Sequence, residues 1–567
     1  MTDHQSLEFD YRPSLDQQAA TPAFHAVIVV GAGPVGLSLA IDLAQRGIAV
    51  LLLDNDHKLS TGSRAICFAK RTLEIFDRLG CGDRMMAKGV SWSVGRVYFR
   101  DQEVYRFDLL PEAGHERPAF INLQQYFVEG FLIERAMQLP NLEIRWDNKV
   151  VGVEAGRDEV TLTVDTPDGP YRLRAGHVAA CDGSRSALRS LMGLESQGRS
   201  FHDRFLIADV RIAGVDFPCE RRFWFDPPFH PGQSVLLHKQ ADGVWRIDFQ
   251  LGWQADSDEE RRPEKIMPRV RAVLDSIGAA GCEVEIVWAS VYTFSCLRMA
   301  HFRRGRVLFA GDAAHGVSPF GARGANSGVQ DADNLAWKLA MVTRGEAPDA
   351  LLDSYAGERE FAADENILHS TRATDFITPK SEVSRLFRDA VLDLSRDHAF
   401  ARRLVNSGRL SVATTLRESA LSTPDIDAFD GAMVPGAAAA DAPLMRDGRA
   451  TWLLRELGPG FTLLFFGTEA DARGVRVGCA SAHQPASGGT RRCAEAHPTG
   501  QCTVLCIDEH ALVDSEGLLA KRYDARPGTA YLLRPDRHVA ARWRMPTEAA
   551  VRAALARACG RTAENAR

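Results

Sequence analysis

The first part of the chain combines short apolar runs with a glycine-rich turn and a helix-like stretch. Residues 26–30 form a β-branched apolar run, and the glycine-rich segment 31–36 follows it directly. Residues 37–46 then have a helix-like pattern, and a second apolar run at 49–53 ends in Asp54. A strand, a tight turn, a helix and a second strand in this order predict a βαβ unit.

The residues of this turn have separate physical tasks. Gly31 permits the tight turn, Gly33 lets the backbone approach a pyrophosphate, and Gly36 allows helix and strand to pack closely. The helix that begins near Pro34 offers free N–H groups and a partial positive charge to phosphates. Asp54 can accept hydrogen bonds from two ribose hydroxyls and would repel a 2′-phosphate. The segment therefore predicts a site for FAD or NAD, and by itself it does not separate the two.

Two later segments again place an acid and a glycine after a strand. Residues 177–180 form a short strand that leads into the turn at 181–186 and then a helix. Residues 306–310 form another strand, which delivers the turn at 311–315 and a glycine-rich stretch. A long amphipathic pattern at 329–340 follows and predicts a helix.

Taken in order, these three segments resemble the signatures of the class A flavoprotein monooxygenases, the aromatic hydroxylase family whose archetype acts on 4-hydroxybenzoate. The resemblance covers roughly residues 24–400. It implies FAD as the cofactor, NADH or NADPH as the reductant and O2 as a co-substrate, with oxygen added at flavin C4a and then delivered to a small phenolic or other aromatic compound. The protein would bind, orient, exclude water and help to deprotonate the phenol.

The resemblance also implies roles for residues of this chain. Asp312 would hold ribityl hydroxyls of FAD, and the turn at 182–185 would lie by the pyrophosphate and assist nicotinamide binding. Pro319 resembles a proline whose backbone lies near the reacting ring, which makes it a candidate catalytic residue. The expected cofactor contacts are Gly31, Gly33, Pro34, Gly36, Asp54, Arg64, Gln125, Asp182, Gly183, Arg185, Gly311, Asp312, Pro319, Gly324, Ala325 and Asn326.

The chain departs from the family in its last glycine-rich turn. The family's Gly-Gly-Gln-Gly reads Gly-Ala-Arg-Gly at 321–324. The change is tolerable where backbone amides make the contacts, and Arg323 is the residue that would alter the edge of the flavin pocket. Independently of the resemblance, a helix starting near Ala325 and Asn326 would point its N–H groups at the negative charge of a reduced flavin.

The middle region has the alternation of an antiparallel sheet, which we expect to cover the flavin with one face turned to the substrate. Its candidate substrate-binding residues are Trp224, Arg246 and Tyr292. Arg246 would bind a carboxylate, and Tyr292 would activate the phenol as a second catalytic residue. For each of them the alternative is a place in the core or on a solvated face. His315, beside Asp312, fits a structural role better than that of a catalytic base.

The predicted fold is α/β, with four parts. A Rossmann-like FAD-binding domain takes 24–200 and 296–400, and a substrate-binding sheet domain takes 201–295. A helical section and linker at 401–440 leads to 441–567, which resembles the thioredoxin-like domain of the phenol and hydroxyphenylpropionate hydroxylase branch. Within this last part we expect strands near 462–467, 502–507 and 529–534 and helices at 511–520 and 547–559. Cys502 and Cys506 would be a buried pair on one strand face without redox activity.

Composition narrows the remaining classes of function. The 567 residues are 45% hydrophobic and 25% charged, as in average soluble proteins, and a net charge of −6 gives no reason to expect nucleic acid as a partner. Eleven cysteines without a C-x-x-C pair indicate reduced thiols and no metal site. The polar first twenty residues and the lack of a long apolar run predict a cytoplasmic protein without a membrane segment.

Two other readings stay open. One is a flavin-dependent oxygenase of a non-phenolic, polyketide-like substrate. The other is a nicotinamide dehydrogenase or a silent dinucleotide sensor that uses the first glycine motif alone. The sequence leaves open the substrate, the choice between NADH and NADPH, and whether the chain forms a homodimer.

Overall fold

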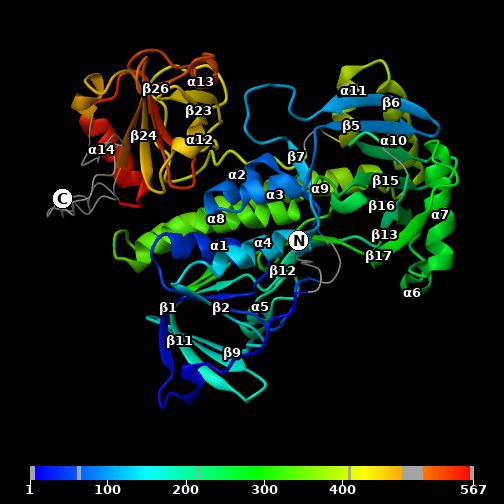
Figure 1. Ribbon diagram of the computed structural model, residues 1–567, viewed down its shortest axis with the longest axis horizontal. Helices are drawn as coiled ribbons and strands as arrows, with labels where there is room; N and C mark the ends of the chain where they lie inside the picture. Colours follow the sequence, from blue (N-terminus) through cyan, green and yellow to red (C-terminus); the bar gives the residue numbers. More distant parts are fainter. Residues whose placement is uncertain (1–6, 61–64, 215–216, 407–409, 476–501, 562–567) are drawn as a thin grey trace.

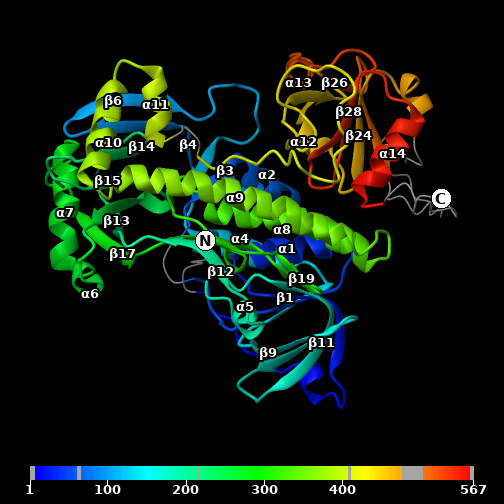
Figure 2. The ribbon, with the colours of Figure 1, turned by 180° about the vertical axis from the view of Figure 1, so that it is seen from behind.

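The computed structural model describes residues 7–60, 65–214, 217–406, 410–475 and 502–561. Figure 1 shows a sheet packed against α1, α4 and α8, a second sheet beside α7 and α10, and a C-terminal sheet beside α14. The long helices α8 (Gly324–Thr343) and α9 (Leu351–Ile377) run across the molecule in contact with each other (Figure 2). The predicted α/β fold is confirmed. Among the described residues, no helix combines the length and the apolar character needed to cross a membrane.

The first sheet is a doubly wound sheet with an antiparallel appendage. Its main path runs β19, β20, β11, β1, β2, β8, and the five strands from β20 to β8 are parallel. The chain reverses direction across the sheet between β1 and β11, which is the switch point where such folds bind ligands. The strands are β1 (Ala23–Val30), β2 (Val50–Leu53), β8 (Leu142–Arg145), β9 (Lys149–Ala155), β10 (Val160–Asp165), β11 (Tyr171–Ala180), β19 (Arg303–Arg304) and β20 (Val307–Phe309).

Helices cover this sheet and bury its apolar strands. The core contains β1 and β2 together with α1, which is buried along most of its length because α4 and α8 pack against it. Two small sheets, β3–β7–β4 and β12–β18–β21, lie beside the main one. The elements are α1 (Pro34–Gln45), α2 (Lys70–Leu79), α3 (Gly82–Lys88), α4 (Gln125–Ala136), α5 (Ala187–Leu191), β3 (Cys67–Ala69), β4 (Val90–Trp92), β7 (Phe120–Asn122), β12 (Ser196–Ser200), β18 (Ser295–Met299) and β21 (His315–Gly316).

The second sheet has seven strands in the order β17, β13, β16, β15, β14, β5, β6. One face packs on α7 (Pro263–Ser276), and the other packs on α9, α10 (Glu382–Leu394) and α11 (Ala399–Asn406). The strands are β5 (Val94–Phe99), β6 (Gln102–Asp108), β13 (Arg204–Ile212), β14 (Arg221–Phe225), β15 (Ser234–Lys239), β16 (Val244–Leu251) and β17 (Val284–Tyr292). The expected range 201–295 omits β5 and β6, and the β14–β5 pair is parallel, not antiparallel.

The C-terminal part contains a four-stranded mixed sheet in the order β25, β24, β27, β28. The three strands predicted here are confirmed, as is the last helix. The helix predicted at 511–520 is wrong in its first half, because Leu512 pairs with Arg446 as a strand and α13 begins only at Leu518. The elements are β22 (Pro443–Arg446), β23 (Arg449–Trp452), α12 (Leu453–Glu456), β24 (Phe461–Phe466), β25 (Cys502–Ile507), β26 (Leu512–Val513), α13 (Leu518–Arg522), β27 (Ala530–Leu533), β28 (Val539–Trp543) and α14 (Glu548–Ala558).

Cys502 and Cys506 are buried in one apolar cluster with α14, as predicted for a strand face. The thioredoxin-like identity of the domain stays a prediction. The section before it is helical only to Asn406 within the described residues, and 410–440 contains neither a helix nor a named strand.

A buried network of charges joins the C-terminal sheet to α8 and α9. Arg534 follows β27, and its Nη2 donates to Glu358 Oε2 on α9 at 2.9 Å. Its Nε also donates to Asp536 at 3.0 Å, while Lys338 on α8 donates to the same Glu358 oxygen at 2.7 Å. All four side chains are buried. Buried charges are tolerated only when paired, so this network holds the domain in one place.

Candidate functional site

The three motif loops leave the first sheet side by side at the carboxyl ends of neighbouring strands. Val30 of β1 is in register with Ala180 of β11, and Ala180 is in register with Phe309 of β20. Two backbone bonds continue this pairing into the loops, from Cys181 N to Val30 O at 2.8 Å and from Ala310 N to Ala180 O at 3.0 Å. Segments far apart in the sequence therefore meet at the switch point of the sheet.

Glycines allow these loops to touch. A Cβ on Gly31 would lie 2.4 Å from Cys181 O, and a Cβ on Gly36 would lie 1.9 Å from Gly31 O. A Cβ on Gly311 would lie 2.9 Å from the Val35 side chain. Because no real Cβ comes this close to such atoms, side chains at these three positions would force the loops apart.

Gly33 differs from these glycines, because a Cβ placed there would meet nothing within 4 Å. It precedes α1, so its backbone is open at the helix end whose free N–H groups are expected to form a pyrophosphate seat. Asp182, in the second loop, adds a buried Oδ1 without a hydrogen-bond partner among the described residues, while its Oδ2 accepts from Leu188 N at 3.0 Å. Open space, helix N–H groups and an unsatisfied polar atom fit the adenosine diphosphate part of FAD.

Asp54 closes the first turn from the end of β2. Its Oδ2 accepts from Ala32 N at 2.5 Å, and its Oδ1 accepts from Asp56 N at 2.8 Å. Burial raises the pKa of this carboxyl, and the two backbone donors oppose the shift. The aspartate thus orders the turn, and its contact with a ribose stays a prediction.

The third loop is braced from behind by Asp331 of α8. Asp331 Oδ2 lies 2.7 Å from His315 Nε2 and accepts from Gly311 N at 2.9 Å. Arg359 Nε donates to the other oxygen at 2.6 Å, and all these side chains are buried. His315 therefore has a structural partner, as the sequence suggested. Asp312, in contrast, is exposed on the same loop.

The turn at 321–324, which leads into α8, is where the sequence differs from the family's glycine-rich turn. Ala322 has a φ of 53°, a left-handed conformation that costs free energy in a residue with a side chain. Arg323 is buried, and its Nη1 donates to Phe320 O at 2.9 Å, so its side chain turns back onto the loop. Asn326 donates to Cys67 O and accepts from Ala69 N, each at 2.8 Å, which ties α8 to β3. Gly324 and Ala325 form the first turn of the helix.

The remaining predicted cofactor contacts lie in loops around this region. Gln125 begins α4, accepts from Ala65 N at 3.0 Å and donates to Glu129 at 2.8 Å. Gly183 has a φ of 76° with open space at its Cβ position, and Arg185 beside it is exposed. Arg64 lies outside the described residues. Pro319 is exposed next to Phe320, a ring that contacts the second sheet through Phe205 at 5.0 Å.

The three predicted substrate residues do not share one face of the second sheet. Arg246 and Tyr292 are linked by Trp288, which lies under the Arg246 guanidinium at 5.7 Å and beside the Tyr292 ring at 6.3 Å. Trp224 packs instead in the cluster under α7, stacked on Tyr98 at 5.2 Å. The alternation of β14 therefore separates Trp224 from the other two, which corrects its expected place in one pocket with them.

Arg246 is buried and already has an anionic partner. Its Nε and Nη2 donate to the two carboxylate oxygens of Asp209, each at 2.8 Å. Sequence reasoning overlooked this pair and the neighbouring polar residues Arg221 and Asp248. A signal was present, because Arg246, Asp248 and Gln250 recur at every second position of the apolar strand β16. Polar residues with this period on a buried strand indicate a polar pocket on one face.

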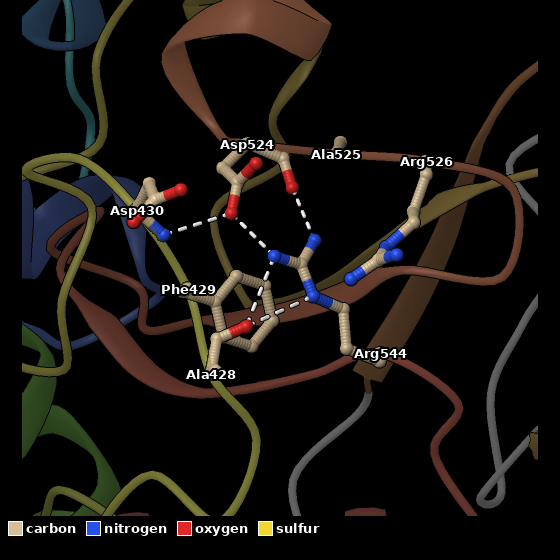
Figure 3. A pocket seen from close by; sticks show the side chains of 7 residues that line it. All are labelled: Ala428, Phe429, Asp430, Asp524, Ala525, Arg526 and Arg544. Carbon is tan, nitrogen blue, oxygen red and sulfur yellow. Dashed lines mark hydrogen bonds and ion pairs between the residues drawn. The ribbon is translucent and has the colours of Figure 1, made fainter.

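A hollow of about 390 Å³ lies elsewhere, between the linker and the C-terminal sheet. Figure 3 shows Arg544 there, donating to Ala428 O at 3.0 Å and paired with Asp524, beside the ring of Phe429. None of the motif residues lines it. Arg544 and Asp524 already bind each other there, so we do not take the hollow as the cofactor site.

Comparisons with known proteins agree with the convergence of the three loops. A family model described as FAD binding domain matches residues 25–370, more than half of the chain. A 3-(3-hydroxy-phenyl)propionate/3-hydroxycinnamic acid hydroxylase of Mycolicibacterium smegmatis is 31% identical over 372 residues, which are 66% of this chain and 65% of that protein. A protein of the same name from Mycobacterium sp. strain JLS is 28% identical over 524 residues, 91% of this chain and 88% of that one.

A solved structure extends the likeness to the whole fold. The flavin-dependent monooxygenase PieE, crystallised in complex with FAD and substrate, matches with a TM-score of 0.79 and 22% identity. The match covers 96% of this chain and 100% of that chain. The three sheets of Figure 1, with the helices packed on them, are therefore arranged in a known fold.

Proposed function

The chain belongs to the family of proteins with this FAD-binding domain, and from that membership we propose that it is a single-component monooxygenase that hydroxylates a phenolic or other aromatic compound. NADH or NADPH would supply the electrons, and O2 would supply the oxygen atom. The observation that carries the proposal is the meeting of the loops after Val30, Ala180 and Phe309 at one switch point. One dinucleotide can contact all three loops only in this arrangement.

When bound, FAD supplies the redox and oxygen chemistry of hydroxylation. The chain's own part is to bind and orient it. The N-terminus of α1 beyond Gly33 would hold the pyrophosphate, Asp54 would bind the ribose, and Asp312 would bind hydroxyls of the ribityl chain. The N–H groups at the start of α8, around Gly324 and Ala325, stabilise negative charge on the ring system.

The substrate would lie between the start of α8 and the inner face of the second sheet, which carries Arg246 and Tyr292. Tyr292 is half-buried and Pro319 is exposed, and in this proposal the Tyr292 ring and the Pro319 backbone would border the substrate. Arg246 contributes positive charge that Asp209 already balances, so it orders the pocket more than it attracts an anion. Closing such a space excludes water from the reaction.

The experiment is a screen of NADH and NADPH oxidation by the purified protein with a panel of phenols, with product masses measured. We expect a phenol to accelerate reductant consumption and to gain one oxygen atom. A response to non-aromatic compounds alone would favour the polyketide-like alternative. A colourless protein that takes up no added FAD would favour a nicotinamide dehydrogenase or a dinucleotide sensor.

Asp312→Ala tests the cofactor site directly. Asp312 is exposed on its loop, so its loss should leave the fold intact and weaken FAD binding roughly 10- to 100-fold, about 1.4–2.8 kcal/mol. Asp275→Asn, on the outer helix α7, is the matched control and should bind FAD like the wild type. Equal affinity in all three proteins would refute the role of Asp312. A cytoplasmic location and a homodimer stay predictions.

A further inference from the structure

A row of polar side chains crosses the inner face of the seven-stranded sheet. Strand pairing places Asp209 opposite Arg246 and Arg246 opposite His238. Arg222 pairs with Leu237, so Arg221 and His238 are neighbours at the end of that pairing. Asp248, two positions after Arg246, faces the same side in the next row.

Three members of this group have buried polar atoms without a partner among the described residues. They are Nε of Arg221, Nδ1 of His238 and Oδ1 of Asp248. Arg221 is 7% exposed and His238 is 4% exposed. A buried polar atom without a hydrogen bond costs about 1–3 kcal/mol. Such a cost at three neighbouring residues indicates a ligand that completes their hydrogen bonds.

The group lies beside the start of α8. The His238 ring is 6.1 Å from the Trp92 ring, and Trp92 Nε1 donates to Asn122 Oδ1 at 2.8 Å. Cys67 donates to the same oxygen at 3.1 Å, and its carbonyl accepts from Asn326 of α8. This chain of contacts joins the polar row to the loop that would face the flavin ring.

The two arginines of the row differ in their partners, because Arg246 is paired with an acid and Arg221 is not paired among the described residues. Asp209 neutralises Arg246 through two hydrogen bonds. No ion pair is found for Arg221 or for Asp248 among the described residues, although Arg221 is buried and Asp248 is half-buried on the same face. A carboxylate and a guanidinium that lie on one face of a sheet without an ion pair between them can act together on a single ionisable group of a ligand.

Resting on the proposed function, we propose that Asp248 accepts the proton of a ring hydroxyl of the substrate and that Arg221 stabilises the phenolate formed. The O–H bond of the phenol breaks, its proton forms a new O–H bond with the Asp248 carboxylate, and the electron pair stays on the ring oxygen. Ionisation makes the ring more electron-rich and therefore a better acceptor of an oxygen atom. The substrate class is a phenol that binds with its hydroxyl towards the sheet.

The charges around Asp248 suit this task. The charged and titratable groups that face it are Arg246 on its own strand, Asp209 on β13, Arg221 on β14, His238 on β15 and Cys67 on β3. Burial raises the pKa of Asp248 to about 7, although Arg246 and Arg221 oppose the shift. Burial and the same two arginines lower the pKa of His238 well below its ordinary value, so His238 is neutral. A base works best with a pKa near the operating pH.

Asp248→Asn tests the assignment with two kinds of phenol. With a weakly acidic phenol, we expect kcat/KM to fall roughly 100-fold or more, the usual contribution of a general base. With a nitro-substituted phenol, already ionised at neutral pH, the loss should shrink to within a few-fold. The wild type should show a rise in kcat/KM through about pH 7 with the weak acid, and Asp248→Asn should lose it. An equal loss with both phenols, or an unchanged pH profile, would overturn the proposal.

Two further variants keep the test decisive. Arg221→Met should shift the rise to higher pH, because Arg221 opposes the rise of the Asp248 pKa and its loss lets that pKa increase further. Tyr292→Phe should keep the pH dependence of kcat/KM that the wild type shows with the weakly acidic phenol. If this variant alone loses the rise through pH 7, Tyr292 and not Asp248 accepts the proton. FAD content is measured for each, with Asp275→Asn as the control.

A binding measurement separates this proposal from the proposed function. The ultraviolet difference spectrum of a phenol added to the holoenzyme reports ionised ring oxygen without turnover. A phenolate signal that disappears in Asp248→Asn supports the subsite even where no product forms. A neutral bound phenol in the wild type above pH 7 would overturn the subsite while hydroxylation could still be observed.

Discussion

Asp331 Oδ2 lies 2.7 Å from His315 Nε2, and both side chains are buried behind the third motif loop. The same oxygen accepts the N–H of Gly311, so one carboxylate holds the beginning and the end of that loop. Although burial alone would raise it, His315 and Arg359 hold the pKa of Asp331 below its ordinary value. The loop is thus ordered by a charge that never needs to touch the cofactor.

Asp331→Asn should therefore destabilise the protein and loosen the loop together. The change keeps the size of the side chain but leaves Arg359 buried without its counter-charge, which costs about 3–5 kcal/mol. Chemical denaturation measures the free energy of unfolding, and fluorescence titration measures FAD affinity. Asp333→Asn, on the same helix, leaves the loop untouched and is the control for FAD affinity. Wild-type stability and affinity in Asp331→Asn would show that the loop orders itself.

The glycines of the first motif should divide into two classes. Gly36→Ala places a Cβ 1.9 Å from Gly31 O, so we expect a loss of about 3 kcal/mol in stability. Gly33→Ala meets nothing in the protein and should leave stability within about 0.5 kcal/mol, while FAD affinity falls roughly tenfold. Thermal unfolding without added FAD and FAD titration distinguish the two. If Gly33→Ala binds FAD normally, the open region is not the pyrophosphate seat.

Local spacing was sufficient to predict the βαβ unit with its glycine-rich turn, because each part of it is a short segment with its own physical requirement. Gly31, Gly36 and Asp54 lie within one βαβ unit, and their order alone defines the turn. The meeting of this turn with Asp182 and Asp312 was inferred from the family resemblance. It depends on parallel pairing of β1, β11 and β20, which no local pattern contains.

The substrate face could not be predicted in the same way. Alternation shows that Trp224 and Arg246 each face one side of their own strand, but the register between β14, β15 and β16 decides whether these sides agree. Asp209 is distant from Arg246 in the sequence, so their pairing was not visible either. Leu512 was misplaced for the same reason, because its strand partner Arg446 comes from a distant segment.

Ala322→Gly should stabilise the protein, since glycine adopts the left-handed conformation without strain. The φ of 53° costs an alanine about 1–2 kcal/mol, and the greater freedom of glycine in the unfolded chain offsets about 0.5–1 kcal/mol of the gain. We expect a net increase of about 0.5–1 kcal/mol in the free energy of unfolding. Ala553→Gly, exposed within α14, is the control and should lose about 1 kcal/mol. A loss in both variants would place Ala322 in an ordinary conformation.

The C-terminal domain should depend on Arg534 for its attachment. Arg534→Met keeps most of the side-chain volume but removes the cation between Glu358 and Asp536, two buried acids that then lose their main counter-charge. Breaking a buried pair in this way costs about 3–5 kcal/mol. Arg552→Met removes an exposed ion pair with Glu548 on the same domain and should cost less than about 1 kcal/mol. Chemical denaturation and limited proteolysis of the same variants distinguish local release of the C-terminal domain from global unfolding. Equal stability of the two variants would mean that apolar contacts of Trp337 with the C-terminal sheet, and not the charges, hold the domain on α8.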